Sequence, residues 1–348
     1  MCARLLRCSL LRPAPPDFMA PRVLPPAPAK LVHERGIPAF GTYCGHIGQL
    51  SWQALQQSPW HRLLRPLHHK RWQYAALAHD DYFIGVAVVD AGWVCTAFAY
   101  LFDRRQRCLL ADFSADGLPL LSAQLDDRPF GDATFRRGRQ RIAFRRAEQR
   151  LELTINTPGL KLAAHLALPA TDQTLAVIAP ANWHAHATHK SSALAVSGFA
   201  EAGGQRFSLD DAVGSLDASN GLLARETGWR WASAHAPGLG FNLQAGYMGD
   251  AENALWLDGE LLPVGAARFD YDAANPLTPW HIHTDDGAVD LQFQPEGARA
   301  ENKDLIIAAS RYIQPIGHFS GTLIHPDTGR AYPVNRLAGV TEDHTSRW

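Results

Sequence analysis

Short apolar segments separated by turn residues make up most of the chain. RWQYAALAH is followed by a turn at Asp80 and Asp81, and YFIGVAVVD is followed by a turn at residues 90–92. Segments of this length, rich in aromatic and β-branched residues and bounded by turn residues, are typical of β-strands. Successive antiparallel strands joined by tight turns form a meander. No long helical period alternates with these segments, so the pattern predicts a mainly β fold and disfavours a parallel α/β fold.

The second half of the chain has the same pattern. Strand-turn-strand units follow one another from LAVSGFAEAGGQRFSL to the region of residue 334. Glycine-containing turns that suit β-hairpins are expected at Gly203–Gly204, Asp258–Gly259, Asp286–Gly287 and Thr328–Gly329. Both halves are therefore expected to form antiparallel sheets.

One short helix is expected in SPWHRLLRPL. Ser58 is a suitable N-cap residue, and Pro59 suits the first helical position. Apolar residues recur at helical spacing from Trp60 to Leu67, and Pro66 is expected to keep the helix brief.

An internal similarity relates the two halves. RWQYAAL around Trp72 and WRWASAH around Trp229 share an aromatic-x-aromatic-Ala pattern and lie about one barrel domain apart. We therefore expect two tandem antiparallel up-and-down barrels of the calycin or lipocalin type, or two sandwiches, with few short helices. The expected β domains are residues 37–168 and 169–348. Residues 1–36 are interpreted as a disordered or wrongly annotated N-terminal tail.

Composition excludes several functional classes. Lys plus Arg is 33 and Asp plus Glu is 34, so no basic excess points to nucleic acid. No apolar run reaches the ~18 residues of a membrane-spanning helix, so no integral membrane segment is expected.

The 5 cysteines are irregularly spaced without a Cys-x-x-Cys pair, which argues against a disulfide framework or a cysteine zinc site and favours a reducing, cytoplasmic location. Nucleotide-binding glycine motifs are absent, and we expect no cofactor.

Several segments resemble one bacterial protein family. They are LDASNGLLARETGWRWASA (residues 216–234), ENALWLDG (residues 252–259) and GVTEDHTSRW (residues 339–348), supported by HHKRWQYAAL and AFAYLFDR. The family is known as domain of unknown function 2804, and the resemblance runs from about Ile37 to Trp348. It looks distantly related to two-domain lipocalin-like proteins, among them carotenoid hydratases. The resemblance implies a pair of calycin-type barrels and no established activity.

Three histidines stand close together in NWHAHATHK. On a strand, His184 and His186 would share one face, and His189 would lie on the other. A second pair, His281 and His283 with Asp285 nearby, could complete a tetrahedral zinc site with the first pair. The first pair has no third ligand in register, and 16 histidines make chance pairs common. We therefore expect no metal site.

The strongest candidate site is Asp217 with Trp229, Trp231 and His235. A carboxylate beside tryptophans can be desolvated and hold a raised pKa, which a general acid that protonates an alkene requires. Trp229 and Trp231 would share one face of a strand, and His235 has the same parity. We expect Asp217 and His235 to be catalytic if the protein is an enzyme. The alternative is that the tryptophans belong to the core and that Asp217 caps a turn.

Five further residues are candidate ligand contacts: Arg230, Lys190, Asn242, Lys70 and Trp72. Lys190 fits the family pattern better than the neighbouring histidines do. Lys70 and Trp72 resemble the cation and tryptophan that close the bottom of lipocalin barrels, which would be a structural role. Arg230 separates the two tryptophans, and Asn242 lies in the next expected strand, GFNLQAGY.

Two functional classes remain. The first is a binding protein that encloses an apolar, lipid-like or isoprenoid molecule in a barrel cavity. The second is a cofactor-independent hydratase, isomerase or cyclase with an aspartate general acid. A buried Asp217 that faces a cavity beside a partner base would favour catalysis, and a collapsed barrel would indicate a structural role. Because the sequence shows no complete acid–base pair, binding of an apolar small molecule is the preferred interpretation, with the oligomeric state open.

Overall fold

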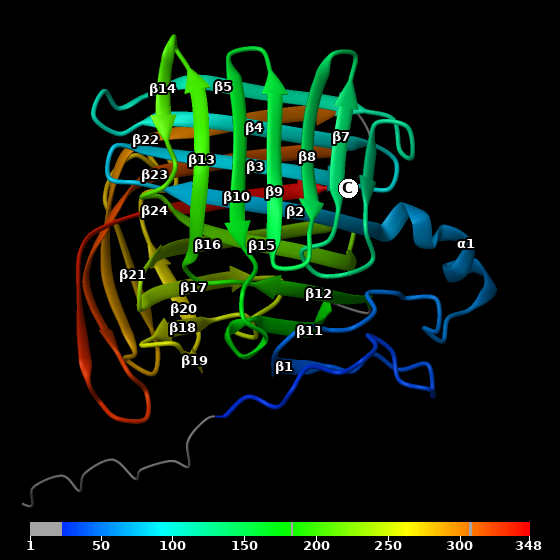
Figure 1. Ribbon diagram of the computed structural model, residues 1–348. Coiled ribbons are helices and arrows are strands. Elements are labelled where there is room, and N and C mark those ends of the chain that lie inside the picture. The colour runs from blue at the N-terminus through cyan, green and yellow to red at the C-terminus, as the bar shows by residue number, and fades with distance from the viewer. Residues whose placement is uncertain (1–22, 182–183, 306–307) are drawn as a thin grey trace, which may run out of the picture.

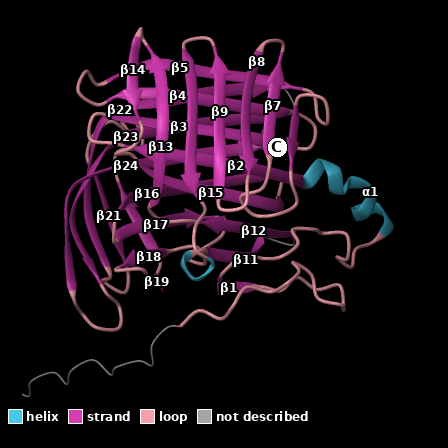
Figure 2. Cartoon of the chain, viewed as in Figure 1, coloured by secondary structure: helices cyan, strands magenta, loops and turns pink. Residues whose placement is uncertain are grey.

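The described chain is mainly β, as predicted (Figures 1 and 2). The computed structural model describes residues 23–181, 184–305 and 308–348. These residues form one nearly closed eleven-stranded antiparallel barrel, one curled nine-stranded half-barrel and one short α-helix. Residues 1–22 of the expected tail lie outside the described residues.

The main path of the first sheet contains eleven of its fifteen strands. Its strands are β2 (His69–Ala78), β3 (Tyr82–Asp90), β4 (Cys95–Asp103), β5 (Cys108–Gly117), β6 (Ala123–Leu125), β7 (Ala133–Arg137), β8 (Gln140–Arg146), β9 (Arg150–Thr157), β10 (Leu160–Ala167), β13 (Leu194–Ala202) and β15 (Val213–Leu222). Attached at its side are β1 (Gly41–Cys44), β11 (Leu175–Ala181), β12 (His184–Lys190) and β14 (Gln205–Ser208), and a 3-10 turn spans Thr171–Gln173. The main path is β5-β4-β3-β2-β15-β13-β10-β9-β8-β7-β6. Figure 1 shows β7–β10 crossing over β2–β5, so the sheet folds back on itself.

The second sheet contains the remaining strands. They are β16 (Glu226–Ala236), β17 (Leu239–Gly246), β18 (Ala254–Leu257), β19 (Glu260–Pro263), β20 (Ala267–Asp270), β21 (Trp280–Thr284), β22 (Val289–Leu305), β23 (Ala308–Ile324) and β24 (Ala331–Arg347). Their order is β19-β18-β17-β16-β24-β23-β22-β21-β20. The four expected hairpin turns each join two neighbouring strands, so these predictions are confirmed.

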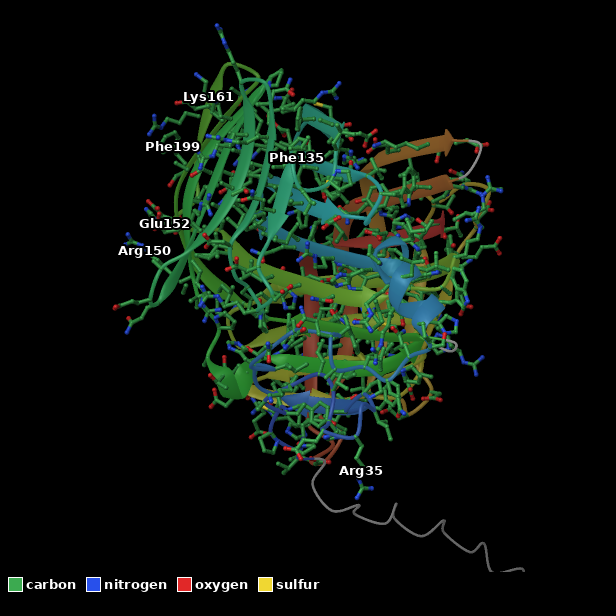
Figure 3. All side chains as sticks on the ribbon, turned by 90° about the vertical axis from the view of Figure 1, so that its right-hand side faces the viewer. Arg35, Phe135, Arg150, Glu152, Lys161 and Phe199 are labelled. Carbon is green, nitrogen blue, oxygen red and sulfur yellow. The ribbon has the colours of Figure 1, made fainter. Side chains whose placement is uncertain are left out.

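Each sheet encloses its own apolar core. Along β9 and β10, residues such as Leu153 and Leu162 point inward, and their neighbours Glu152 and Lys161 lie on the outer surface (Figure 3). The second sheet closes around residues such as Trp280. This alternation is the normal result of a strand with one buried face.

A third apolar cluster joins the two sheets. It includes Tyr74 and Tyr100 from the first sheet and Trp231, Ile316 and Val340 from the second. Strand β3 is consequently buried on both faces over most of its length. Burial on both faces explains why YFIGVAVV is a continuous apolar run rather than an alternating one.

The chain passes from one sheet to the other between Leu222 and Glu226. Strands β13 and β15, which we expected in the second domain, pair with β10 and β2 of the first sheet. The change of sheet therefore does not coincide with the expected boundary at residue 168. β15 pairs with a strand far back in the sequence, and no local pattern reports such a pairing.

The segment before β2 is packed against the body. Leu31 and Val32 are buried in a cluster with Ile47 and Trp52. This differs from our expectation that residues 1–36 form a tail, because the described residues from 23 onward include part of an apolar core. The Pro/Ala-rich composition of this segment gave no signal for its buried apolar positions.

The expected helix is α1 (Pro59–His68). Ser58 caps it by accepting a hydrogen bond from the His61 N–H at 3.4 Å, and Pro59 occupies the first turn. The helix continues two residues beyond Pro66. Within the described residues, no helix is long and apolar enough to cross a membrane.

Candidate functional site between the two sheets

A cavity of about 240 Å³ lies between the two sheets. One wall is the outer face of β2–β4 together with β12 and β15, and the other is the facing side of β16, β17 and β22–β24. We expected a cavity inside a barrel, but this one lies outside both barrel cores. The barrel interiors are filled by side chains such as Phe144 and Phe293.

Two rows of cross-strand neighbours face each other across the cavity. The first row is Lys190, Asp217 and Tyr74 on β12, β15 and β2, and the second is Gln244, Trp231 and Glu342 on β17, β16 and β24. The Trp231 ring connects the two rows, because it lies edge-on to Tyr74 at 6.0 Å and 5.8 Å from Lys190 Nζ. Neighbouring strands therefore present their side chains to the same space.

Lys190 forms a buried charge cluster with two carboxylates. Its ammonium is paired with Asp217, and it lies 3.4 Å from Glu252 Oε2. Glu252 comes from the turn between β17 and β18, so three separate parts of the chain build the cluster. Asp217 also accepts a hydrogen bond from Ser219 Oγ at 3.4 Å. One cation beside two carboxylates leaves an excess of one negative charge if all three groups are ionised.

This environment changes the protonation of the cluster. Burial raises the pKa of Glu252, and the negative charge of Asp217 raises this pKa further, whereas Lys190 opposes both effects. Burial alone lowers the pKa of Lys190, but Asp217 and Glu252 outweigh it and raise this pKa above its ordinary value. Lys190 therefore stays a cation, and Glu252 is the carboxyl group that burial favours in the protonated form.

A hydrogen-bonded chain crosses from one sheet to the other beside the cavity. Trp229 Nε1 donates to Glu342 Oε1 at 2.8 Å, and Gln314 Nε2 donates to Glu342 Oε2 at 3.0 Å. The hydroxyl of Tyr100 on β4 donates to Gln314 Oε1. These bonds satisfy both Glu342 oxygens and hold the Trp229 ring in place.

Aromatic rings form much of the wall. Trp72 stacks on Trp229 with centroids 6.4 Å apart and planes at 12°, so the two residues of the internal similarity face each other. His186 lies 5.3 Å from the Trp72 ring, and the Tyr247 hydroxyl lies 3.3 Å from His186 Nδ1. Burial lowers the pKa of His186 to about 3, so this ring is a neutral part of the wall at physiological pH.

Gln244 has a buried amide without a partner. Neither Oε1 nor Nε2 has a hydrogen-bond partner among the described residues, although the side chain lines the cavity. A buried amide left unpaired costs free energy. The group is thus suited to bind the polar substituent of a ligand, because it offers both a donor and an acceptor.

The structure brings together five of the predicted site residues. Asp217, Trp229, Trp231, Lys190 and Trp72 all line the cavity. Asp217 is mostly buried within a strand, which differs from the alternative in which it caps a turn.

His235 is not beside Asp217. It shares a face of β16 with Trp229 and Trp231, as predicted, but it lies further along the strand and does not line this cavity. Its Nε2 lies 2.9 Å from Ser233 Oγ, and its Nδ1 lies 3.3 Å from Ser192 Oγ. Burial lowers the pKa of His235 to about 3. These contacts argue against the proton-transfer role that we expected.

Arg230 and Asn242 also lie outside the cavity lining. Arg230 is on the opposite face of β16, where it contacts the Tyr271 hydroxyl at 3.3 Å. Asn242 accepts a hydrogen bond from Trp231 Nε1 and donates one to the Glu252 carbonyl, both at 2.8 Å. Asn242 therefore positions a ring and a turn that do line the cavity.

Lys70 has a structural environment. Its buried ammonium donates to the carbonyls of Leu67 at 2.6 Å and Ala91 at 2.5 Å. It lies 5.5 Å from the Trp348 ring rather than over Trp72. Lys70 therefore contacts a different tryptophan from the one that we expected.

Within the histidine-rich segment, the rings of His186 and His189 lie on opposite sides of β12, and the side chain of His184 lies outside the described residues. His186 faces the cavity, whereas His189 points to the opposite side and accepts a hydrogen bond from the Ile47 N–H at 3.1 Å. In the second pair, His281 and His283 lie beside Asp270 on β20 rather than Asp285, with ligand atoms within 4.8 Å of one another. Asp270 is exposed. Our expectation of a protein without a metal centre stays a prediction.

Sequence reasoning missed several cavity residues. They are Glu252, Gln244, Tyr74 and Tyr247. One of them had a signal, because Glu252 belongs to ENALWLDG, one of the segments on which the family resemblance rests. Of the others, Tyr247 lies in the turn after β17 and the rest are ordinary strand residues, and the cavity neighbours of all of them come from distant parts of the chain.

Solved structures share this architecture. The kievitone hydratase of Nectria haematococca matches with a TM-score of 0.51 and 10% identity over 80% of this chain and 88% of that one. An AttH-like protein of Nitrosomonas europaea matches with a TM-score of 0.50 and 15% identity over 79% of this chain and 92% of that one. At these identities the likeness shows the fold alone. No curated protein matches the sequence.

The family model gives a more specific result than the structural likeness. It is described as Domain of unknown function (DUF2804), and it matches residues 25–348, which include every residue of the cavity lining. The resemblance found in the sequence is therefore confirmed, and the chain belongs to the DUF2804 family.

Proposed function

We propose that the protein is a cofactor-independent enzyme that hydrates or isomerises a small, largely apolar, unsaturated molecule. The observation that carries this proposal is the cluster of Asp217, Glu252 and Lys190 at an aromatic cavity. The sequence alone favoured binding because it showed no acid–base pair. Two carboxylates that converge on one cavity supply such a pair.

The two carboxyl groups would have different roles. Glu252, whose pKa is raised by burial, would deliver a proton to one carbon of the double bond. Asp217, paired with Lys190, would accept a proton from the water that attacks the other carbon. Hydration then adds one water across the bond without redox change. Isomerisation would use the same groups to remove a proton from one carbon and return one to another.

The walls suit the remaining requirements. The faces of Trp229 and Trp231 carry negative π-electron density that can stabilise a developing carbocation. Gln244 would bind a hydroxyl or carbonyl group of the substrate and so fix its orientation. A cavity of about 150 Å³ admits benzene, so the 240 Å³ available here has room for one or two rings.

The fold of the kievitone hydratase does not establish this reaction for the chain. Its name gives hydration as the first reaction to test. The apolar-ligand interpretation is contained in the proposal, because an enzyme of this kind must first bind an apolar molecule. Binding without turnover is the competing outcome.

Isotope labelling tests the proposal. The purified protein is incubated with a panel of small alkenes, unsaturated ketones and isoprenoids in H₂¹⁸O or D₂O, and products are analysed by mass spectrometry. Hydration incorporates ¹⁸O and, in D₂O, also deuterium at carbon, whereas isomerisation incorporates deuterium at carbon without ¹⁸O. Asp217→Asn and Glu252→Gln should each lower turnover by about 10²–10⁴-fold, as for loss of a general acid or base.

Glu201→Gln is a matched control, because Glu201 is a carboxylate on β13 whose side chain contacts Arg206 away from the cavity. It should leave turnover unchanged. If a compound binds but takes up no label, the protein is a binding protein. If either cavity variant turns over a labelled substrate as fast as the wild type, this assignment of the acid and base is wrong.

A further inference from the structure

The apolar side of α1 faces solvent. Trp60, Leu63, Leu64 and Leu67 lie on one face of the helix, yet Trp60 is 73% exposed and Leu67 is 52% exposed. No residue of α1 is buried, and Figure 1 shows the helix standing off the body. A surface helix normally turns its apolar face to the core. Within the described chain, nothing covers this face.

A second apolar patch lies at the same edge of the first sheet. Arg71 on β2, Asp90 on β3, Cys95 on β4 and Gly117 on β5 are successive cross-strand neighbours. The helix ends directly before β2, and the turn at residues 118–121 begins directly after β5. The leucines of this turn, at positions 118, 120 and 121, are exposed, Leu121 by 78%.

The cavity between the sheets reaches this edge. Ala91 and Trp93, in the turn between β3 and β4, line it, as does the exposed Asp116 beside the edge residue Gly117. Lys70 ties α1 to the same turn by donating to the carbonyls of Leu67 and Ala91. Both apolar patches therefore flank the exposed end of the cavity.

Helix α1 itself is basic. The segment PWHRLLRPLH contains Arg62 and Arg65 and no acidic residue, and Arg62 is exposed. Beside the helix, Arg71 is shared by Asp90 at 2.7 Å and Asp127 at 3.2 Å, and Lys303 is shared by Asp116 at 2.6 Å and Glu301 at 2.9 Å. An amphipathic helix with Trp and Leu on one face and arginines on the other is the pattern of an interfacial helix.

We propose that α1 and the turn at residues 118–121 dock on an anionic lipid surface and hold the cavity mouth against it. The apolar side chains would enter the boundary between headgroups and acyl chains, and the exposed Arg62 would pair with a lipid phosphate, whereas Arg65 donates to Gln57 Oε1 and the Trp52 carbonyl. An apolar ligand could then pass between bilayer and cavity without crossing water. Docking on lipid does not depend on any particular reaction in the cavity. Failure of the docking proposal and failure of the proposed enzymatic activity are therefore distinguishable.

Vesicle sedimentation tests the proposal with the full chain. Vesicles of phosphatidylcholine alone are compared with an equimolar mixture of phosphatidylcholine and phosphatidylglycerol. The wild type should bind the anionic vesicles more strongly. The double variant Trp60→Ser with Leu63→Ser should bind at least about tenfold more weakly, because it removes two exposed apolar side chains from the contact. Arg62→Glu should weaken binding to the anionic vesicles only.

Matched variants separate docking from general surface effects. Leu67→Ser should weaken vesicle binding, whereas Leu277→Ser should not, since Leu277 is exposed to a similar extent, 48%, in the loop between β20 and β21. Circular dichroism and melting temperature confirm that each variant is folded. Absence of binding by the wild type, or equal binding by the Trp60→Ser, Leu63→Ser variant, overturns the proposal. The proposal is also overturned if the wild type is a dimer that this double variant converts to a monomer, because a second copy would then cover the apolar face of α1.

Discussion

Glu252 lies 3.4 Å from the Lys190 ammonium, which is also paired with Asp217. The two carboxylates reach this cation from the β17–β18 turn and from β15. Burial raises the pKa of Glu252 despite the nearby positive charge. The cluster therefore makes stability depend on pH in a direction that can be worked out.

A raised pKa in the folded protein means that the folded state binds more protons than the unfolded state. The pKa of Glu252 in the unfolded chain is 4.5. Above that pH, the stabilising contribution of Glu252 is progressively lost as pH rises through the raised pKa of the folded state. Glu252→Gln removes this loss, so the variant should gain stability relative to the wild type between pH 4 and pH 8. Urea unfolding followed by tryptophan fluorescence measures the difference. A difference in the free energy of unfolding between wild type and variant that does not change with pH would contradict the prediction.

Trp231 and Arg230 are adjacent residues on opposite faces of β16, and they give a matched pair. Trp231→Ala should weaken binding of a ligand found in the compound panel by about 2 kcal/mol, roughly thirtyfold in Kd, if the ring packs on that ligand. Arg230→Ala should leave Kd unchanged, because Arg230 contacts Tyr271 away from the cavity. Equal Kd values in both variants would place the ligand elsewhere.

Lys70 gives a second pH dependence, of opposite sign. Burial lowers the pKa of Lys70 from 10.5 to about 8. The unfolded state then binds more protons between these values, so the contribution of Lys70 makes stability rise with pH, by roughly 3 kcal/mol over the whole window. Lys70→Met should lack this rise. The wild type and variant are compared by urea unfolding at pH 7.5 and pH 10, and parallel pH profiles would show that Lys70 does not titrate in this window.

Two N-terminal deletions test the packing of the first described residues. A chain that starts at Met19 should melt at the same temperature as the full chain, since residues 1–18 offer no apolar period. A chain that starts at Ile37 loses Leu31 and Val32, which are buried. It should be less stable by about 3 kcal/mol or more, at about 1.5–3 kcal/mol for each buried side chain. Equal melting temperatures of the two truncated chains would contradict this packing.

Local features of the fold were predictable because they depend on neighbouring residues. The hairpins at Asp258–Gly259 and Asp286–Gly287 follow from turn chemistry. The helix cap at Ser58 follows from its side-chain oxygen. The pairing of β2 with β15 depends on the whole chain, so the point at which the chain changes sheets was not predictable.

In the candidate site, too, local features were predictable and contacts between distant parts of the chain were not. The shared face of Trp229 and Trp231 followed from strand periodicity, and both rings line the cavity. Strand periodicity predicts which face of β16 a residue occupies, but not what lies opposite that face. It therefore grouped His235 with Trp229 and Trp231, although His235 lies further along β16, beyond the cavity. Glu252 was missed as a partner of Asp217 because it reaches the cluster from a turn, and turns have no periodic signal.

The pairing of β2 with β15 has a consequence for biosynthesis. The strand at residues 69–78 leaves the ribosome long before its partner at residues 213–222, and its paired edge stays open during that time. Exposed apolar strand edges promote aggregation. A nascent chain of this protein therefore needs protection until Leu222 emerges, and a fragment that stops at residue 168 would keep the vulnerable edge permanently.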